Sequence, residues 1–471
     1  MQETIVCKFG GSSLANAEQI RRVADIVKAD ERRRLVVVSA PGKDIGHPYK
    51  ITDLLYNLYF RTHSSGSDGV KYQEIEGSAN ELMGRIGGVY SGIASGLGLP
   101  DSAASQCMGE LERLVADPRA THHDIASRGE NFNARLIAQF LDAEFADAAD
   151  LIRITDKNAD GGADGDNEDT MRRVAELRNS KRIVVIPGFY GIYAPTGEIR
   201  TYKRGGSDLT GSIISAGVGA SLYENWTDQP GVRCCDPRIF PPEEAPGIPV
   251  IRHMTYREAR ELTYMGFEVF NDKAIGPARR RQIPVNIRYT QNPLEDGTLI
   301  SAAAHEGNGL VRGIAGRNGF CRVDVEKFLL GEEVGFGSRL LGIFAGRGLS
   351  YEHAPSGIDN ISVILEQRQI DGIEGEIVGE INEKLHPDKV DVMKGLALVA
   401  VVGEGMKHTI GVAATITRCL ADSGVNIEIL NQGASESNII IGVRDTDYKK
   451  AVVALYHALI RDSPYKGEVR R

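Results

Sequence analysis

The stretch Lys8-Phe9-Gly10-Gly11-Ser12-Ser13 decides how the N-terminal part of the chain folds. It ends a predicted strand over residues 4–9 and precedes a predicted amphipathic helix whose N-cap is Asn16. The apolar run Leu35–Val38 has the composition of a strand buried on both faces of a parallel sheet. This succession of strand, glycine-rich turn, helix and strand predicts a three-layer α/β domain.

Outward from this stretch, the pattern of buried strands continues to about residue 300. Further strands are predicted over residues 183–188, 221–226 and 283–289, and we expect the last of them to close the domain. Beyond a polar linker at residues 305–309, strands and helices alternate in two similar stretches, with helices predicted over residues 336–347 and 410–423. This internal repeat predicts two ferredoxin-like α+β units.

The composition excludes several classes of protein. Of the 471 residues, 55 are Lys or Arg and 64 are Asp or Glu, so the net charge is −9 and binding to nucleic acid is not expected. No apolar run approaches the roughly 20 residues that a membrane-spanning helix needs. The six cysteines form no CxxC pair, and no secretory signal precedes the first strand. We therefore expect reduced cysteines and a cytoplasmic protein without membrane contact.

The glycines of the opening stretch are suited to binding phosphate. Gly10 and Gly11 let backbone N–H groups approach an anion, and the N-terminus of the following helix favours negative charge. Lys8 is placed to neutralise a phosphoryl group during transfer. The alternative is a tight turn beside a surface lysine, which a short motif does not exclude.

Three further turns carry polar residues where a strand ends or a helix begins. In the glycine-rich turn at residues 203–208, Arg204 is placed to pair with a carboxylate or phosphate, and Asp208 either holds a metal, positions the lysine or only caps the helix. Ser127-Arg128-Gly129-Glu130 puts a carboxylate in a turn before a helix, where it either binds a substrate ammonium or interacts only with the helix N-terminus. Trp226-Thr227-Asp228 ends a strand, where open sheets bind ligands, although an ordinary strand exit has the same pattern.

Taken in order, these motifs resemble those of aspartate kinases in the amino acid kinase superfamily. They are KFGGSS at residues 8–13, Ser39-Ala40, Ser127–Glu130, RGGSD at residues 204–208 and Trp226–Asp228 followed by Asp236-Pro237-Arg238. Residues 350–359 resemble the first effector-binding ACT domain of that family, and residues 432–438 resemble the second. The resemblance covers nearly the whole chain, and the pair KFGGSS and RGGSD is its most specific part.

The resemblance implies a three-layer α/β/α amino acid kinase catalytic domain over residues 1–300, followed by ferredoxin-like ACT domains over residues 310–385 and 386–471. It implies transfer of the ATP γ-phosphoryl group, with Mg²⁺, to the β-carboxylate of L-aspartate, giving 4-phospho-L-aspartate. This step opens the biosynthesis of lysine, threonine and methionine. The alternatives are a kinase for another acidic amino acid, such as glutamate, and a non-catalytic protein that senses amino acids.

By this resemblance, the site residues fall into three groups. Lys8 is the catalytic lysine that stabilises the phosphoryl group in transfer, and Asp208 orients it. The residues expected to hold aspartate are Ser39, Thr52, Glu130, Arg204 and Ser207. The residues expected at the nucleotide and its phosphates are Gly10, Gly11, Ser12, Thr227, Asp228, Arg233 and Arg238.

Two positions depart from the family's pattern. Arg233 stands where many members have a tyrosine. Met265-Gly266-Phe267-Glu268 replaces a Phe-Gly-Ala-Lys whose lysine contacts the nucleotide. Because Glu268 cannot supply that positive charge, we expect Arg233, Arg238 or Lys273 to do so.

In the first predicted ACT domain, Glu352, Ser356 and Asp359 are expected to bind an amino-acid effector. Either carboxylate is suited to a side-chain ammonium, which favours lysine as the inhibitor and leaves threonine open; the alternative is that both are only solvated. The resemblance also implies a homo-oligomer, most simply a dimer that pairs through its ACT domains.

Overall fold

The computed structural model describes residues 3–463 without residues 64–69, 71, 157–166, 204, 268–273, 304–308 and 434–436. The chain forms two compact units. The first comprises Met1–Val232, Val250–Ala259 and Glu268–Ala304, and the second comprises Arg233–Pro249, Arg260–Phe267 and His305–Arg471. Two short segments within residues 1–300 thus belong to the second unit.

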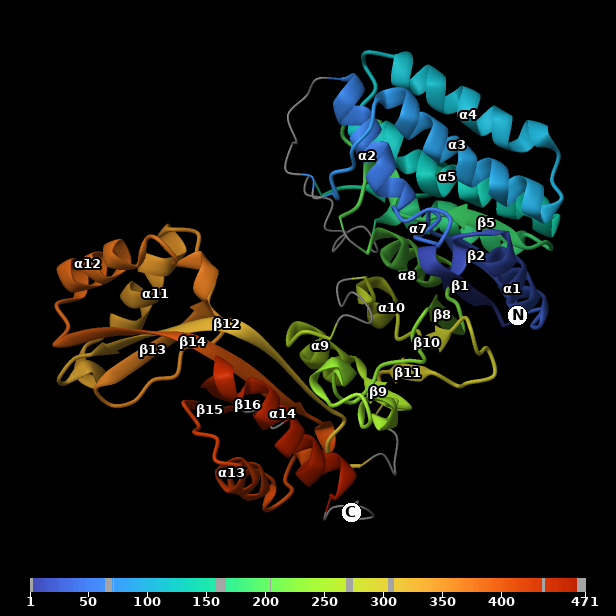
Figure 1. The fold of residues 1–471 in the computed structure, drawn as a ribbon. Helices are drawn as coiled ribbons and strands as arrows, with labels where there is room; N and C mark the ends of the chain where they lie inside the picture. The colour runs from blue at the N-terminus through green and yellow to red at the C-terminus, as the bar shows by residue number, and fades with distance from the viewer. Residues whose placement is uncertain are drawn as a thin grey trace. The chain divides into compact units, whose positions relative to one another are not determined.

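An eight-stranded sheet is the framework of the first unit (Figure 1). Its strands are ordered β3 (Glu144–Phe145), β5 (Val184–Pro187), β2 (Arg33–Val38), β1 (Ile5–Phe9), β8 (Leu222–Thr227), β10 (Val285–Tyr289), β11 (Thr298–Ser301) and β9 (His253–Thr255). All neighbours pair in parallel except β10 and β11. The carboxyl ends of β1, β2, β5 and β8 therefore share one edge of the sheet, where the loops with the sequence motifs begin.

The strands expected near residues 183–188 and 221–226 are confirmed as β5 and β8. The expectation that residues 283–289 close the domain is wrong, because β11 and β9 extend the sheet beyond β10. These two strands have four and three residues, too few for a recognisable pattern in the sequence.

Helices cover both faces of this sheet and make the three layers that the sequence predicts (Figure 1). One face of β1 and β2 shares a core with α1 (Ala17–Lys28), α2 (Ile51–Thr62), α3 (Ala79–Leu97), α4 (Asp101–Ala116) and α5 (His122–Leu141). On the other face lies α8 (Gly206–Val218), which contacts the alternate residues of β1. The shorter elements of the first unit are α6 (Ala148–Leu151), β4 (Arg153–Ile154), α7 (Glu168–Glu176), β6 (Tyr190–Tyr193), β7 (Glu198–Thr201) and α10 (Gly276–Arg280). Helix α9 (Tyr256–Tyr264) begins in the first unit and ends in the second.

Side-chain caps set where two of these helices begin. The Asn16 side chain accepts a hydrogen bond from the Gln19 N–H at 3.0 Å, which confirms the predicted N-cap of α1. A capping box of Thr121 and Asp124 starts α5 at His122. Our prediction that Ser127–Glu130 lies in a turn before a helix is wrong, because this capping box places the segment inside α5.

The second unit contains a five-stranded sheet in the order β13 (Asn360–Glu366), β12 (Gly313–Glu326), β14 (Lys389–Val402), β16 (Asn438–Arg444) and β15 (Ile429–Gln432). All its neighbouring strands are antiparallel, and its helices are α11 (Phe336–Gly346), α12 (Glu374–Leu385), α13 (Val412–Asp422) and α14 (Tyr448–Tyr456). The helices expected over residues 336–347 and 410–423 are confirmed as α11 and α13.

The two 14-residue strands β12 and β14 run through both halves of this unit. Residues 313–317 of β12 pair with residues 398–402, next to β16, whereas residues 320–326 pair with residues 389–396, next to β13. A register irregularity between Arg317 and Phe320 separates the two stretches. The two halves of the second unit therefore share both long strands, and no single residue of the chain separates one half from the other.

All six cysteines lie in the described residues, and none forms a disulfide. Within the same residues, no helix is both long and apolar enough to cross a membrane.

Candidate active site

Lys8 is buried at the centre of the sheet, beside the glycine turn. Its Nζ lies 2.5 Å from Oδ1 of Asp208 at the start of α8, and only 9% of its side chain is exposed. The alternative of a surface lysine is therefore excluded. The same nitrogen is 3.7 Å from the position that a Cβ on Gly10 would occupy. The amine thus stands over the turn that we expect to bind phosphate.

Two residues of β8 hold Asp208 in place. The Asn225 side chain donates to Asp208 Oδ1 at 3.1 Å, and the Tyr223 hydroxyl donates to the Asp208 carbonyl at 3.0 Å. Asn225 lies in none of the sequence motifs, and it pairs in register with Lys8 across β1 and β8. The sequence did contain a signal for this residue: its amide side chain lies inside a strand that is predicted to be buried. A buried polar side chain needs a hydrogen-bond partner, which makes such a residue a candidate.

The turn at residues 10–13, which we call the phosphate turn after its expected role, packs against the residues after β2, and this packing requires glycine at Gly11 and Gly42. The Gly10 N–H donates to the Trp226 carbonyl at 3.1 Å, and the Gly42 N–H donates to the Gly11 carbonyl at 2.8 Å. A Cβ on Gly11 would lie 2.9 Å from the Ala40 carbonyl oxygen, and one on Gly42 would lie 2.5 Å from the Gly11 carbonyl carbon. The residues that follow β1 and β2 pack closely against each other at Gly11 and Gly42. Ser12, which is exposed, lies in the same turn as Gly11.

Glu130 is a buried carboxylate in the interior of α5. It is 4% exposed, and its Oε2 has no hydrogen-bond partner among the described residues. Burial raises its pKa to about 8, against the opposing effect of the Ala40 backbone N–H. Such a group is suited to receive a positively charged ligand group, because that charge would compensate the cost of desolvation.

The expected aspartate-binding residues around Glu130 come from three elements. Gly129 allows close packing, since a Cβ there would lie 3.0 Å from the Ala40 Cβ and 3.5 Å from the Ile51 Cγ2. This brings the exit of β2, with Ser39, and the first turn of α2, with Thr52, next to the middle of α5. The residues next to Ser39 and Thr52 thus pack beside Glu130, and the binding of aspartate by these three residues stays a prediction.

The second glycine-rich turn leads into α8. Gly205 has φ 81°, a left-handed conformation that glycine adopts without strain. Ser207 occupies the first turn of α8, 2.7 Å from where a Cβ on Gly188 would sit at the exit of β5. Arg204 lies outside the described residues, as do Glu268 and Lys273.

Thr227 and Asp228 lie at the carboxyl end of β8, as expected. The Thr227 hydroxyl donates to Asp228 at 3.2 Å, and the Thr227 carbonyl accepts the Thr290 N–H at 3.0 Å. The Thr290 hydroxyl is 2.7 Å from that of Ser13, so this strand end is tied to the phosphate turn.

Arg233 and Arg238 belong to the second unit, and their role at the nucleotide stays a prediction. The Arg233 guanidinium donates to the Ile248 carbonyl, and Arg238 pairs with Asp236 at 2.8 Å. Both cations therefore already have partners.

The expected effector residues lie between α11 and β13. Glu352 accepts from the Tyr264 hydroxyl and lies 3.5 Å from the Arg317 guanidinium. Asp359 Oδ1 accepts the Leu329 N–H at 3.0 Å, and Ser356 forms a backbone bridge with Ile361. An incoming ammonium at Glu352 would have to compete with Arg317.

Comparison with known proteins identifies the family. Residues 3–289 match the amino acid kinase family, and residues 399–459 match an ACT domain. Aspartokinase 3 of Bacillus subtilis (strain 168) is 40% identical over 466 residues, which is 96% of this chain and 97% of the relative. The crystal structure of Clostridium acetobutylicum aspartate kinase is 38% identical, with a TM-score of 0.84, and the match covers 97% of this chain and 100% of that one.

Two crystal structures of Escherichia coli aspartokinase III match at lower identity. The complex with aspartate and ADP (R-state) is 25% identical with a TM-score of 0.72, covering 97% of this chain and 99% of that one. The complex with lysine and aspartate (T-state) is 26% identical with a TM-score of 0.70, covering 98% and 100%. The resemblance inferred from the motifs is therefore confirmed, and the chain belongs to the amino acid kinase family, among the aspartokinases.

Proposed function

We propose that this chain transfers the γ-phosphoryl group of ATP to the β-carboxylate of L-aspartate, forming 4-phospho-L-aspartate and ADP. The observation that carries the proposal is the buried Lys8–Asp208 pair over the phosphate turn, in the same unit as the buried Glu130, whose Oε2 has no hydrogen-bond partner among the described residues. The first supplies a fixed positive charge for a phosphoryl group, and the second supplies a binding site for an ammonium.

In the transfer, a β-carboxylate oxygen of aspartate forms a bond to the γ-phosphorus, and the bond from that phosphorus to the β–γ bridging oxygen breaks. Lys8 stabilises the negative charge of the phosphoryl oxygens, and Asp208 fixes the direction of the lysine amine. No side chain needs to form a covalent intermediate, because the substrate carboxylate is itself the nucleophile.

For the substrates, Glu130 binds the α-ammonium of aspartate and Arg204 its α-carboxylate, with Ser39, Thr52 and Ser207 around them. Gly10, Gly11 and Ser12 bind the phosphates of ATP, and Thr227 and Asp228 line the nucleotide site. Arg233 and Arg238 are proposed at the nucleotide because Glu268 stands where many family members have a lysine; in the structure both arginines pair within the second unit.

Mg²⁺ fits this site as an ion carried by the nucleotide. Among the described residues, no cluster of three or more His, Cys, Asp or Glu side chains has the arrangement of a metal site. Asp208, in the first turn of α8, and Asp228, directly after β8, would hold the ion, and phosphate oxygens and water would supply the other ligands. When bound, the ion neutralises phosphate charge.

The second unit is proposed to bind a regulatory amino acid at Glu352, Ser356 and Asp359, with lysine favoured over threonine. We also propose a homo-oligomer, most simply a dimer formed through the ACT domains, in which the effector changes activity by favouring one conformation. The reduced cysteines support a cytoplasmic location.

The test is a coupled assay of ADP release with L-aspartate, with L-glutamate and without acceptor. Release that depends on aspartate supports the proposal. Release with glutamate alone identifies a kinase for another acidic amino acid, and no release with either identifies a non-catalytic sensor.

A further inference from the structure

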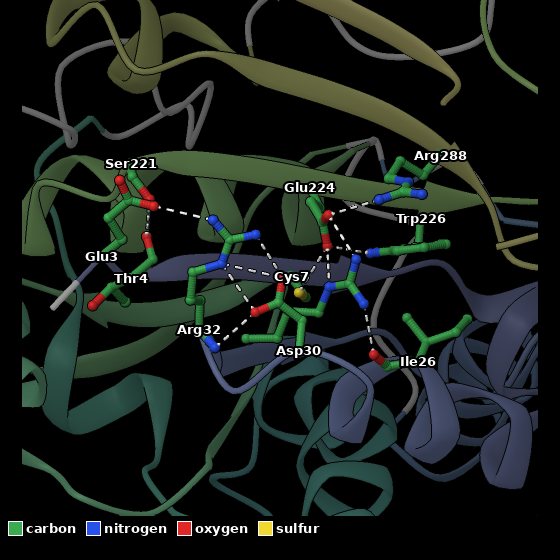
Figure 2. A network of polar contacts seen from close by, with 11 residues as sticks. Glu3, Thr4, Cys7, Ile26, Asp30, Arg32, Ser221, Glu224, Trp226 and Arg288 are labelled. Atoms are coloured by element: carbon green, nitrogen blue, oxygen red, sulfur yellow. Dashed lines mark hydrogen bonds and ion pairs between the residues drawn. The ribbon is translucent and has the colours of Figure 1, made fainter. Parts of the chain in front are cut away.

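A second buried carboxylate, Glu224, lies on β8 and is surrounded by donors (Figure 2). It is 1% exposed. Arg33 donates to its two oxygens at 2.8 and 3.0 Å, and Arg288 donates at 3.1 Å. The Trp226 Nε1–H and the Cys7 thiol donate at 3.0 and 3.3 Å. We call these five residues the Glu224 network.

The Glu224 network fixes the ring of Trp226, which is fully buried. The guanidinium carbons of Arg33 and Arg288 lie 5.3 and 4.7 Å from the ring centroid, within the range of cation–π interactions. Phe9 stacks on the same ring at 5.9 Å, with an interplanar angle of 15°. The Trp226 side chain is thus restrained by two cations, by the stacked Phe9 ring and by its hydrogen bond to Glu224.

Trp226 connects the network to the phosphate turn through its backbone. Its carbonyl accepts the Gly10 N–H at 3.1 Å, and the next two residues are Thr227 and Asp228. Arg33 also donates to the Ile26 carbonyl at 2.7 Å, in the last turn of the helix that follows the phosphate turn. The network is therefore attached to the chain on both sides of that turn.

The network acts from the face of β8 opposite to Lys8 and Asp208. Alternate residues of a strand point to opposite faces, and Tyr223 and Asn225 hold Asp208 on the other side. A buried ion pair seldom stabilises a protein more than apolar packing does. We therefore attribute the role of the Glu224 network to the geometry that it fixes. We propose that the Glu224 network positions Trp226, and through it the phosphate turn, for the phosphoryl group; this rests on the proposed kinase function.

The chain offers a matched pair of arginines for the test. Arg32 stands next to Arg33 and pairs with Asp30 at 2.8 Å and Glu3 at 3.0 Å, but 46% of its side chain is exposed and none of these contacts involves Trp226 (Figure 2). In Arg33→Ala, kcat should fall at least about tenfold with the KM for aspartate within about twofold, because a small displacement of the turn misplaces the phosphoryl group. Arg32→Ala should match wild type, and Arg33→Lys should recover part of the loss.

Trp226 is the chain's only tryptophan, so its fluorescence reports directly on the network. The anisotropy of its emission should fall in Arg33→Ala and stay unchanged in Arg32→Ala. If Arg33→Ala does not fold, Arg288→Gln removes a contact whose arginine is 16% exposed, and the same changes are expected. Full kcat in the folded variant, an equal loss in Arg32→Ala or unchanged anisotropy would overturn the proposal.

A titration with ADP alone separates this proposal from the proposed function. We expect ADP to change Trp226 emission and to bind Arg33→Ala at least about tenfold more weakly than Arg32→Ala. If wild type binds ADP in this way but releases none from ATP with aspartate, the proposed function fails and the positioning role stands. Equal ADP affinity of the two variants refutes the positioning role.

Discussion

Glu130 and Glu224 are both buried carboxylates of the first unit, but their surroundings differ. Glu224 accepts hydrogen bonds from two arginines, a tryptophan and a thiol. Glu130 has an oxygen without a partner among the described residues, and burial raises its pKa to about 8. A buried charge that the protein itself compensates holds structure together, whereas one left uncompensated is available to a ligand.

The largest expected effect is on stability. Glu224→Ala leaves two arginines without their buried partner, so the free energy of unfolding should fall by about 3–5 kcal/mol. Glu130→Ala should cost much less, because one oxygen of this carboxyl group has no hydrogen-bond partner among the described residues. Urea unfolding of both variants measures this, and equal losses would contradict the distinction between the two carboxylates.

The next effect concerns aspartate binding. In Glu130→Ala, the KM for aspartate should rise by the equivalent of about 2–4 kcal/mol, since a charge-paired contact with the ammonium is lost. The KM for ATP should stay near wild type. Steady-state kinetics with each substrate varied in turn provides the measurement, and a rise in the KM for ATP alone would show that the role is misassigned.

Lys8 is a buried cation that pairs with one carboxylate, that of Asp208. Lys8→Ala should lower kcat at least about a hundredfold, the scale for losing one preorganised charge in a transition state. Lys28→Ala, at the exposed end of α1, is the control and should leave kcat unchanged. Wild-type turnover in Lys8→Ala would remove this residue from the catalytic site.

In the second unit, the carboxylates of Glu352 and Asp359 both have partners, as Glu224 does. We expect Ser356→Ala or Asp359→Ala to relieve end-product inhibition, with uninhibited kcat within about twofold, because only a coupling of about 1–3 kcal/mol is at stake. Inhibition curves with lysine, threonine and both together give the answer. Full inhibition in both variants would place the effector elsewhere.

The last prediction concerns how stability depends on pH, step by step over each pH unit. An isolated glutamic acid has a pKa near 4.5, and in the folded protein that of Glu130 is about 8, so between these values the folded state binds more protons than the unfolded state. Glu130 therefore makes the protein less stable as pH rises through this window, by at most about 1.4 kcal/mol per pH unit. Chemical denaturation at several pH values should show a shallower slope in Glu130→Gln. An identical slope in this variant would mean that Glu130 does not titrate in this range.

Local patterns in the sequence account for much of the first unit. Strands corresponding to β1, β2, β5 and β8 were predicted from the sequence, and the predicted N-cap at Asn16 starts α1. The pattern near Ser127–Glu130 indicated a carboxylate that is buried, but it indicated the wrong element, since the capping box at Thr121 and Asp124 went unrecognised. The strands β9 and β11 were too short to predict and exist because neighbouring strands pair with them.

The sequence by itself determined the turns and their chemistry: Lys8 before two glycines, Asp208 after two more, and a carboxylate at Glu130. Only the tertiary structure decided which charges are compensated. Arg33 and Glu224 are 191 residues apart in sequence and form a buried pair, and Asn225 holds Asp208 because β8 lies beside β1. Residue types and short spacings are local properties, whereas the partner of a buried charge depends on which distant strands and helices pack together.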